Sequence, residues 1–220
     1  MAAVIFDLDG TLADTSADLL AAANCCFRDM GLGDVLGPQD AGIALRGGRA
    51  MLRAGLKRVD QLDDAVIARY YPMLLDAYGA AISVHSYIYP GAMTAIETLK
   101  SQGYGVGICT NKPAGLAEQL LRDLGVRDAF GSLVGADSLP VRKPDPAPLF
   151  EAARRLGGDP RACILIGDSD TDRNTARAAH VPSVLVTFGP AKDDMAALEP
   201  DALLDNYAAL PAVTAALLPR

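Results

Sequence analysis

The sequence predicts an α/β protein with a three-layer core, in which a parallel sheet lies between helices, and with an inserted helical domain. Two observations predict this architecture. From residue 91 onward, segments with helical spacing of apolar residues alternate with short apolar runs, which is the pattern of βαβ units. The apolar runs are typical of buried parallel strands, and polar residues follow each of them. These runs cover residues 2–6, 104–109, 133–134 and 162–166.

The first expected element is a strand over residues 2–6, directly before Asp7. A helix should follow, beginning at Thr15 or Ser16, because apolar residues then recur at helical spacing. Gly31 ends this pattern, so the helix should end before it.

Two more helices are expected before the chain returns to the core, over residues 46–58 and 62–78. No strand is predicted between residues 14 and 86. The predicted domains are a core made of residues 1–13 and 87–220 and a helical domain made of residues 14–86.

The remaining elements should alternate between helix and strand. A helix is expected over residues 91–101, and further helices after Pro113, Pro146 and Thr171. Additional strands are expected at 184–186 and, at the sheet edge, at 202–204. A terminal helix should cover residues 207–218.

Composition limits the possible functions. The chain has 220 residues, half of them hydrophobic, which suffices for one sizeable core. A net charge of −7 without a Lys/Arg-rich run disfavours nucleic-acid binding and favours a small-molecule partner. The N-terminal apolar run is too short for a signal peptide, and no stretch approaches the ~20 apolar residues of a membrane span, so we expect a cytoplasmic protein. Only two histidines are present, which argues against a zinc site or a Ser-His-Asp triad.

Asp7 and Asp9 come directly after the first predicted strand. Their spacing of two residues places both side chains on one face if strand geometry continues. Two carboxylates so close repel one another, and a divalent cation is the usual compensation. Mg²⁺ is expected, because its preferred ligands are hard oxygen atoms and no His or Cys lies nearby. A simple Asx-type bend before Gly10 is the alternative interpretation.

Three more polar clusters follow predicted strands or lie between them. They are Thr110-Asn111-Lys112, Arg142-Lys143-Pro144-Asp145-Pro146 and Gly167-Asp168-Ser169-Asp170-Thr171-Asp172. Because parallel strands present their carboxyl ends at one edge of a sheet, these clusters should meet in space.

Taken together, the motifs resemble those of the haloacid dehalogenase superfamily, and among its branches those of the phosphoglycolate phosphatases. The resemblance rests on D-x-D-G-T-L-x-D at Asp7, the T-N-K turn at Thr110, K-P-x-P at Lys143 and G-D-S-x-x-D at Gly167. It implies a Rossmann-like core, with the helical domain as a cap over the active site. It also implies a Mg²⁺-dependent phosphatase acting on a small phosphate monoester. The chain departs from the family at His180, where glycine usually ends a helix, but His tolerates that left-handed conformation.

The resemblance implies roles for the acidic residues. Asp7 is the expected nucleophile, forming an aspartyl-phosphate, and Asp9 is the expected general acid and base. Asp7, the backbone carbonyl of Asp9, and Asp168 should hold Mg²⁺. Asp172 should act through a water ligand or a hydrogen bond to Lys143, rather than as a direct metal ligand. An acidic helix N-terminus without a metal is the alternative for residues 168–172.

Other residues are expected to bind the substrate. Thr110 and Asn111 can donate hydrogen bonds to a phosphate group, and Lys143 supplies a cation that compensates the carboxylates. Arg49, with Arg46 beside the same Gly pair, could bind a substrate carboxylate or phosphate, or both could be ordinary surface charges.

The first expected substrate is 2-phosphoglycolate. Three alternatives remain open: a hexose-phosphate mutase resembling β-phosphoglucomutase, a phosphatase for another small sugar phosphate or a nucleotide, and a non-catalytic binding protein on the same scaffold. Dehalogenase activity is disfavoured, because that branch lacks a carboxylate at the position of Asp9. A monomer or a homodimer is expected.

Overall fold

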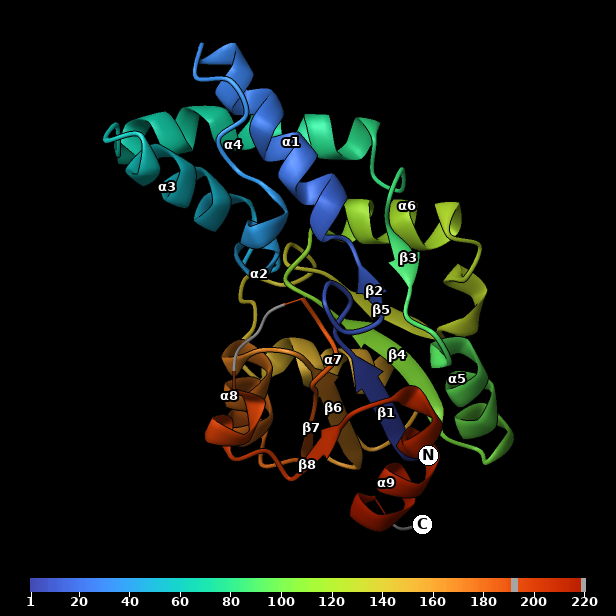
Figure 1. Cartoon of the computed structure of the whole chain (residues 1–220). Coiled ribbons are helices and arrows are strands. Elements are labelled where there is room, and N and C mark those ends of the chain that lie inside the picture. Colours follow the sequence, from blue (N-terminus) through green and yellow to red (C-terminus); the bar gives the residue numbers. More distant parts are fainter. Residues whose placement is uncertain (191–193, 219–220) are drawn as a thin grey trace. The chain divides into compact units, whose positions relative to one another are not determined.

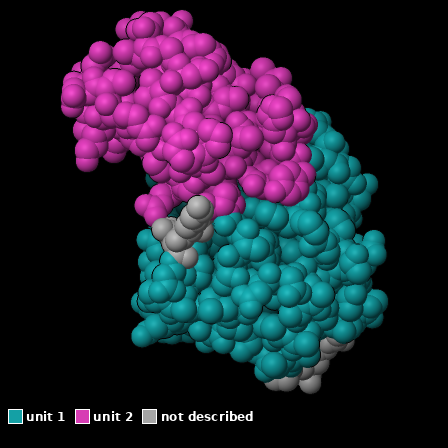
Figure 2. All heavy atoms as spheres, viewed as in Figure 1, with its two compact units in different colours: residues 1–13, 88–189, 193–220 teal, residues 14–87, 190–192 magenta. Residues whose placement is uncertain are grey.

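The computed structural model describes residues 1–190 and 194–218 (Figure 1). These residues form two compact units, coloured separately in Figure 2. Unit 1 contains residues 1–13, 88–189 and the C-terminal part of the chain, and unit 2 contains residues 14–87 and Pro190. Among the described helices, none is long and apolar enough to cross a membrane.

In the described part of unit 1, six strands form one sheet in the order β5-β4-β1-β6-β7-β8, and every neighbouring pair is parallel. β1 lies in the interior of the sheet, between β4 and β6, with Ile5 level with Gly107 on one side and Leu165 on the other. The strands are β1 (Ala3–Phe6), β4 (Gly105–Cys109), β5 (Ser132–Val134), β6 (Cys163–Gly167), β7 (Ser183–Val186) and β8 (Ala202–Leu204).

Helices connect these strands, which is what parallel pairing requires. The α-helices of unit 1 are α5 (Ala92–Ser101), α6 (Ala114–Asp123), α7 (Ala147–Arg155), α8 (Asp170–Ala179) and α9 (Leu210–Leu217). Short 3₁₀ helices are η2 (Arg127–Ala129), η3 (Met195–Leu198) and η4 (Tyr207–Ala209).

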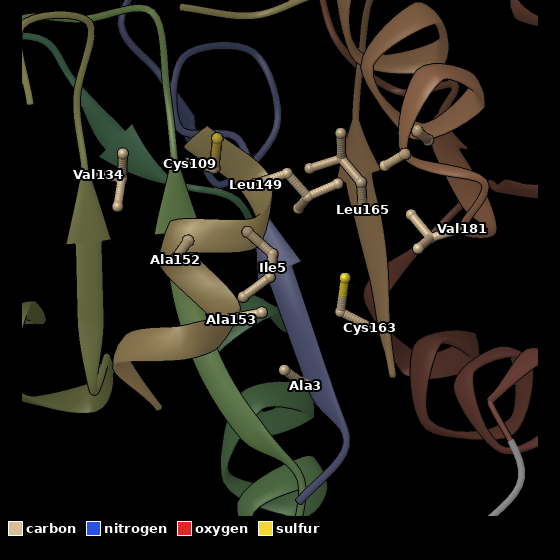
Figure 3. Close-up of a cluster of buried hydrophobic side chains, with 12 residues drawn as sticks. Ala3, Ile5, Cys109, Val134, Leu149, Ala152, Ala153, Cys163, Leu165 and Val181 are labelled. Carbon is tan, nitrogen blue, oxygen red and sulfur yellow. The ribbon is translucent and has the colours of Figure 1, made fainter. Parts of the chain in front are cut away.

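A hydrophobic cluster joins one face of the sheet to α7 and α8 (Figure 3). Ile5 of β1, Leu165 of β6 and Leu149 of α7 are fully buried in it. Each such side chain contributes about 1.5–3 kcal/mol by leaving water. Alternate strand residues such as Phe6 and Ile166 point to the opposite face and are fully buried too, so both faces of the sheet are covered. The α/β fold with a layered parallel sheet is thus confirmed.

Unit 2 contains packed helices. Its elements are α1 (Ser16–Asp29), η1 (Pro38–Asp40), α2 (Ala41–Ala44), α3 (Gly48–Arg58) and α4 (Asp64–Ala80). α3 lies directly on α1, because a Cβ at Gly55 would come within 2.1 Å of the Phe27 ring. The buried Asn24 side chain accepts hydrogen bonds from the amides of Val35 and Leu36, which fixes the chain after α1.

The two chain segments that connect the units pair with one another as β2 (Ala13–Asp14) and β3 (Tyr87–Ile88). Sequence patterning missed this pairing, because a two-residue strand has no measurable periodicity.

Element boundaries differ from the predictions at several places. α4 covers Asp64–Ala80 rather than 62–78, and α8 begins at Asp170, before Thr171. The helix predicted from Arg46 begins at Gly48, because Gly47 before it has a φ of 93°. The terminal helix predicted from Tyr207 begins as the 3₁₀ turn η4, and α9 starts at Leu210. His180 has a φ of 55° and a ψ of 41°, so the predicted left-handed end of α8 is confirmed.

Candidate active site

The carboxyl ends of β1, β4 and β6 lie at the same edge of the sheet (Figure 1). β1 ends at Phe6, and the amide of Asp7 still donates to the carbonyl of Ile166 in β6, at 2.9 Å. The chain then closes a tight loop over residues 7–13, in which three successive amides donate to the carbonyl of Leu8. Gly10 has a φ of 79°, a conformation that favours glycine. The D-G pair of the motif therefore serves the turn that carries the two aspartates.

A buried ion cluster lies beside this loop. Lys143 Nζ is 2.6 Å from Asp172 Oδ1 and 3.1 Å from Asp7 Oδ2, and the lysine side chain is only 1% exposed. Carboxylate oxygens of Asp7, Asp168 and Asp172 lie within 4.8 Å of one another. Thr11 donates its hydroxyl to Asp168 Oδ1 at 3.0 Å. Residues that lie as far apart in the sequence as Asp7 and Asp172 thus form one group.

The turn between β6 and α8 holds Asp172 in place. Ser169 caps α8, and its hydroxyl donates to Asp172 Oδ2 at 2.5 Å. Gly167 is required here for space, because a Cβ at this position would come within 2.3 Å of the Asp172 side chain. The glycine and serine of the G-D-S-x-x-D motif thus place Asp172.

Burial and mutual repulsion change the proton affinities of the cluster. Burial, opposed by Lys143 and reinforced by Asp172 and Asp9, raises the pKa of Asp7 to about 6. Burial, together with the charges of Asp172 and Asp7, raises the pKa of Asp168 well above its usual value. For Lys143, burial lowers the pKa but the carboxylates Asp172 and Asp7 outweigh it, so the pKa is raised and the ammonium stays charged.

Asp9 has a different lysine as its partner. Lys112 Nζ lies 2.6 Å from Asp9 Oδ1, and the two side chains are 4% and 15% exposed. The condition under which Asp7 and Asp9 would share one face of a strand is not met, because β1 ends at Phe6. Among the described residues, the group of carboxylates able to hold a metal contains Asp172, and the side chain of Asp9 is not in it. The expectation for Asp9 concerned its backbone carbonyl and stays a prediction.

Thr110 and Asn111 follow β4 at the same edge. The Thr110 hydroxyl accepts a hydrogen bond from the amide of Lys112 at 3.2 Å. The Asn111 side-chain amide donates to the carbonyl of Lys143 at 3.0 Å. Asn111 therefore fixes the backbone of the residue that supplies the central ammonium group.

Comparison with known proteins identifies the family. The family model for haloacid dehalogenase-like hydrolases matches residues 1–180. The chain belongs to this family. It is 37% identical over 217 residues to a phosphoglycolate phosphatase of Rhodospirillum rubrum, covering 94% of this chain and 88% of the relative. A phosphoglycolate phosphatase of Agrobacterium fabrum is 38% identical over 207 residues, with 94% and 89% covered.

Solved structures agree with this assignment. The crystal structure of a predicted phosphoglycolate phosphatase from Haemophilus somnus superposes with a TM-score of 0.85 at 26% identity, covering 97% of this chain and 98% of that one. The resemblance inferred from the four motifs is therefore confirmed, and this chain is a haloacid dehalogenase-like hydrolase.

The donor set of the hydrolase suits a hard divalent cation. Asp7, Asp168 and Asp172 offer only oxygen ligands, which Mg²⁺ and Ca²⁺ prefer over the nitrogen and sulfur sites of zinc. The described site residues bring four carboxylates but only two ammonium groups, those of Lys112 and Lys143. The excess negative charge is what a bound cation would offset.

Arg49, like Arg46, is a predicted substrate ligand that lies in unit 2. Its guanidinium group stacks over the ring of Tyr71, 4.2 Å from the centroid, at the first turn of α3. Such a cation–π contact preorganises the guanidinium plane without using its hydrogen-bond donors. Arg49 stays a predicted substrate ligand.

Sequence reasoning gave no site role to Lys112, Thr11 or Tyr207. Lys112 and Thr11 stand inside motifs that were recognised, so their position was a usable signal. No local sequence signal pointed to Tyr207. Its hydroxyl donates to the carbonyl of Thr11 at 2.6 Å, although the two residues are 196 positions apart in the sequence. Such a contact depends on the tertiary fold alone.

Proposed function

We propose that this hydrolase is a Mg²⁺-dependent phosphatase that cleaves 2-phosphoglycolate to glycolate and phosphate. One observation carries the phosphatase proposal: a carboxylate suited to attack, Asp7, lies 3.1 Å from a buried ammonium group and next to two further carboxylates. The substrate is supported by the names of relatives that are 37% and 38% identical to this chain over the aligned residues.

Asp7 acts as the nucleophile. One of its oxygens attacks the phosphorus atom, the ester P–O bond breaks, and an aspartyl-phosphate forms. Attack requires the ionised carboxylate. With a pKa of about 6, Asp7 is mostly ionised at neutral pH even before a cation binds.

Asp9 acts as the general acid and base. It protonates the alkoxide that leaves in the first step, and it then takes a proton from the water that attacks the aspartyl-phosphate in the second. Inorganic phosphate is released and both aspartates return to their starting states.

The remaining site residues neutralise the charge of the phosphate group and orient the substrate. Asp7, Asp168 and the Asp9 carbonyl would hold Mg²⁺, which supplies positive charge beside the phosphate when it is bound. Lys143 adds a fixed positive charge, oriented by Asp172. Thr110 and the residues around Asn111 provide hydrogen-bond donors for phosphate oxygens.

In this proposal, unit 2 contributes to substrate specificity. Arg49 binds the carboxylate of the substrate, for which its planar donor pair is well matched. The stacking of Arg49 on Tyr71 supports this role, because a preordered side chain loses less entropy when it binds.

A direct assay tests the function. The protein is incubated with Mg²⁺ and either 2-phosphoglycolate or β-glucose 1-phosphate, and free phosphate and glucose 6-phosphate are measured. We expect phosphate release from 2-phosphoglycolate, and a loss of at least about 10³-fold in Asp7→Asn with the fold retained. Glucose 6-phosphate as the main product would instead establish a mutase, and full activity of Asp7→Asn would remove Asp7 as the nucleophile.

A further inference from the structure

The Lys112 side chain is an ammonium group buried at the edge of the active site, and no step of the mechanism above uses it. It is 4% exposed, and its Nζ lies 2.6 Å from Asp9 Oδ1. A buried lysine is costly unless it is paired, so its presence next to the proton-transferring carboxylate calls for a functional explanation.

The backbone fixes Lys112 on both sides. Its amide donates to the Thr110 hydroxyl at 3.2 Å, and its carbonyl accepts a hydrogen bond from the amide of Ala136 at 2.9 Å. The loop after β5 approaches so closely that a Cβ at Gly135 would come within 2.8 Å of the Lys112 carbonyl oxygen. The backbone that carries the Lys112 side chain is therefore held in place.

The backbone of Asp9 is also held in place, but its side chain must be oriented for proton transfer. It lies in the closed loop over residues 7–13 and forms an isolated bridge with Ala13. The carboxylate is 15% exposed and can rotate about two bonds, whereas proton transfer requires one oxygen to lie within hydrogen-bond reach of the ester oxygen. An ammonium group that holds Oδ1 restricts the rotation of the carboxylate.

We propose that Lys112 is a positioning residue for proton transfer: by binding Asp9 Oδ1 it orients Asp9 Oδ2 toward the leaving oxygen. The inference rests on the proposed function, in which Asp9 is the general acid. It predicts that loss of Lys112 damages only reactions whose leaving group needs a proton. A lysine that merely ties two loops together, or one that binds the phosphate, would affect all phosphate esters alike.

The test compares esters that differ in leaving-group acidity. Phenyl phosphate and p-nitrophenyl phosphate have the same shape apart from the nitro group, but p-nitrophenolate leaves readily without a proton. The measured quantity is kcat/KM, because it includes only the steps up to release of the alcohol and excludes hydrolysis of the aspartyl-phosphate. 2-Phosphoglycolate is measured as the alkyl ester.

The variants are Lys112→Met, which keeps the length of the side chain but removes its charge, and Lys112→Arg, which keeps the charge. In Lys112→Met we expect kcat/KM to fall about 10- to 100-fold for 2-phosphoglycolate and phenyl phosphate, but less than about 3-fold for p-nitrophenyl phosphate. Lys112→Arg should recover part of the loss. Lys100→Met is the matched control: it removes an exposed lysine that donates to the Ala129 carbonyl, and it should leave all three values unchanged.

Asp9→Asn separates failure of this inference from failure of the proposed function. It should show the same dependence on the leaving group, and Lys112→Met added to it should cause little further loss. An equal loss on all esters in Lys112→Met, with the leaving-group dependence intact in Asp9→Asn, would overturn the role of Lys112. Absence of that dependence in Asp9→Asn would overturn Asp9 as the general acid. If Lys112→Met does not fold, Lys112→Gln carries the same comparison.

Discussion

At the scale of single residues, the site concentrates charge where water is scarce. The Lys143 ammonium is 1% exposed and contacts Asp7 and Asp172, yet the Asp7 carboxyl still has a raised pKa, because burial and the neighbouring carboxylates outweigh the lysine. Without a cation, the ionised Asp7 carboxylate therefore destabilises the folded protein, and a bound cation would offset this destabilisation.

This cost can be measured through Asp7→Asn in the metal-free protein. The folded state keeps the Asp7 proton up to about pH 6, whereas the unfolded state loses it near 3.8, so ionising Asp7 lowers the free energy of unfolding across that interval. Asparagine resembles the protonated acid at all pH values. We expect Asp7→Asn to be about 1–3 kcal/mol more stable than the wild type at pH 7, with the difference vanishing below about pH 3.

Urea unfolding at several pH values in the presence of a chelator measures the stability difference between Asp7→Asn and the wild type at neutral and at acid pH. Asp170→Asn is the control, because Asp170 lies nearby at the start of α8 but is exposed, and its loss should change stability by less than about 0.5 kcal/mol. An Asp7→Asn variant that is less stable than the wild type at pH 7 would contradict the assigned direction of the pKa shift.

At the scale of elements, the C-terminal segment contacts the loop over residues 7–13. Tyr207 in η4 is fully buried, its ring packs 5.4 Å from that of Phe188, and its hydroxyl donates to the Thr11 carbonyl. Thr11 in turn donates to Asp168. The segment after β8 thus holds the loop after β1 against the carboxylate at the end of β6.

We expect Tyr207→Phe to weaken Mg²⁺ binding. The ring and its packing remain, but the Thr11 carbonyl loses its partner, and Asp168 loses part of its orientation. The Mg²⁺ concentration for half-maximal activity should rise about 3- to 10-fold, less than the 10–100-fold typical when a direct partner of a metal ligand is removed.

Tyr104→Phe is the matched control, because the Tyr104 hydroxyl also donates to a backbone carbonyl, that of Leu218, at 3.1 Å. Both variants should lose about 1 kcal/mol of stability. Equal Mg²⁺ requirements in the two variants would show that Tyr207 has a purely structural role.

These elements also show what sequence can predict. The strands before Asp7 and Asp168 were predictable because apolar runs and the turn glycines are local signals. The contacts of Lys112 with Asp9 and of Tyr207 with Thr11 join residues 103 and 196 positions apart, and no local pattern encodes them. The positions of Asp7 and Asp168 could be predicted from their motifs, whereas the residues that contact them from distant parts of the chain required the tertiary structure.

At the scale of the whole molecule, the candidate metal ligands come from distant parts of the chain. Asp7 follows β1 and Asp168 follows β6, so their oxygens lie together only when the central part of the sheet is formed. A cation bound there would stabilise the folded state alone, and it would also relieve repulsion in a chain whose net charge is −7.

Mg²⁺ should therefore raise the melting temperature. At a concentration about 100 times the dissociation constant, the gain is about 2.7 kcal/mol, which for a chain of this size corresponds to roughly 5–10 °C. Thermal unfolding followed by circular dichroism, with NaCl at matched ionic strength as the control, measures the shift. Asp168→Asn should remove most of it, because it deletes one of the carboxylates that lie within 4.8 Å of one another. A wild-type melting curve unchanged by millimolar Mg²⁺ would contradict the metal site.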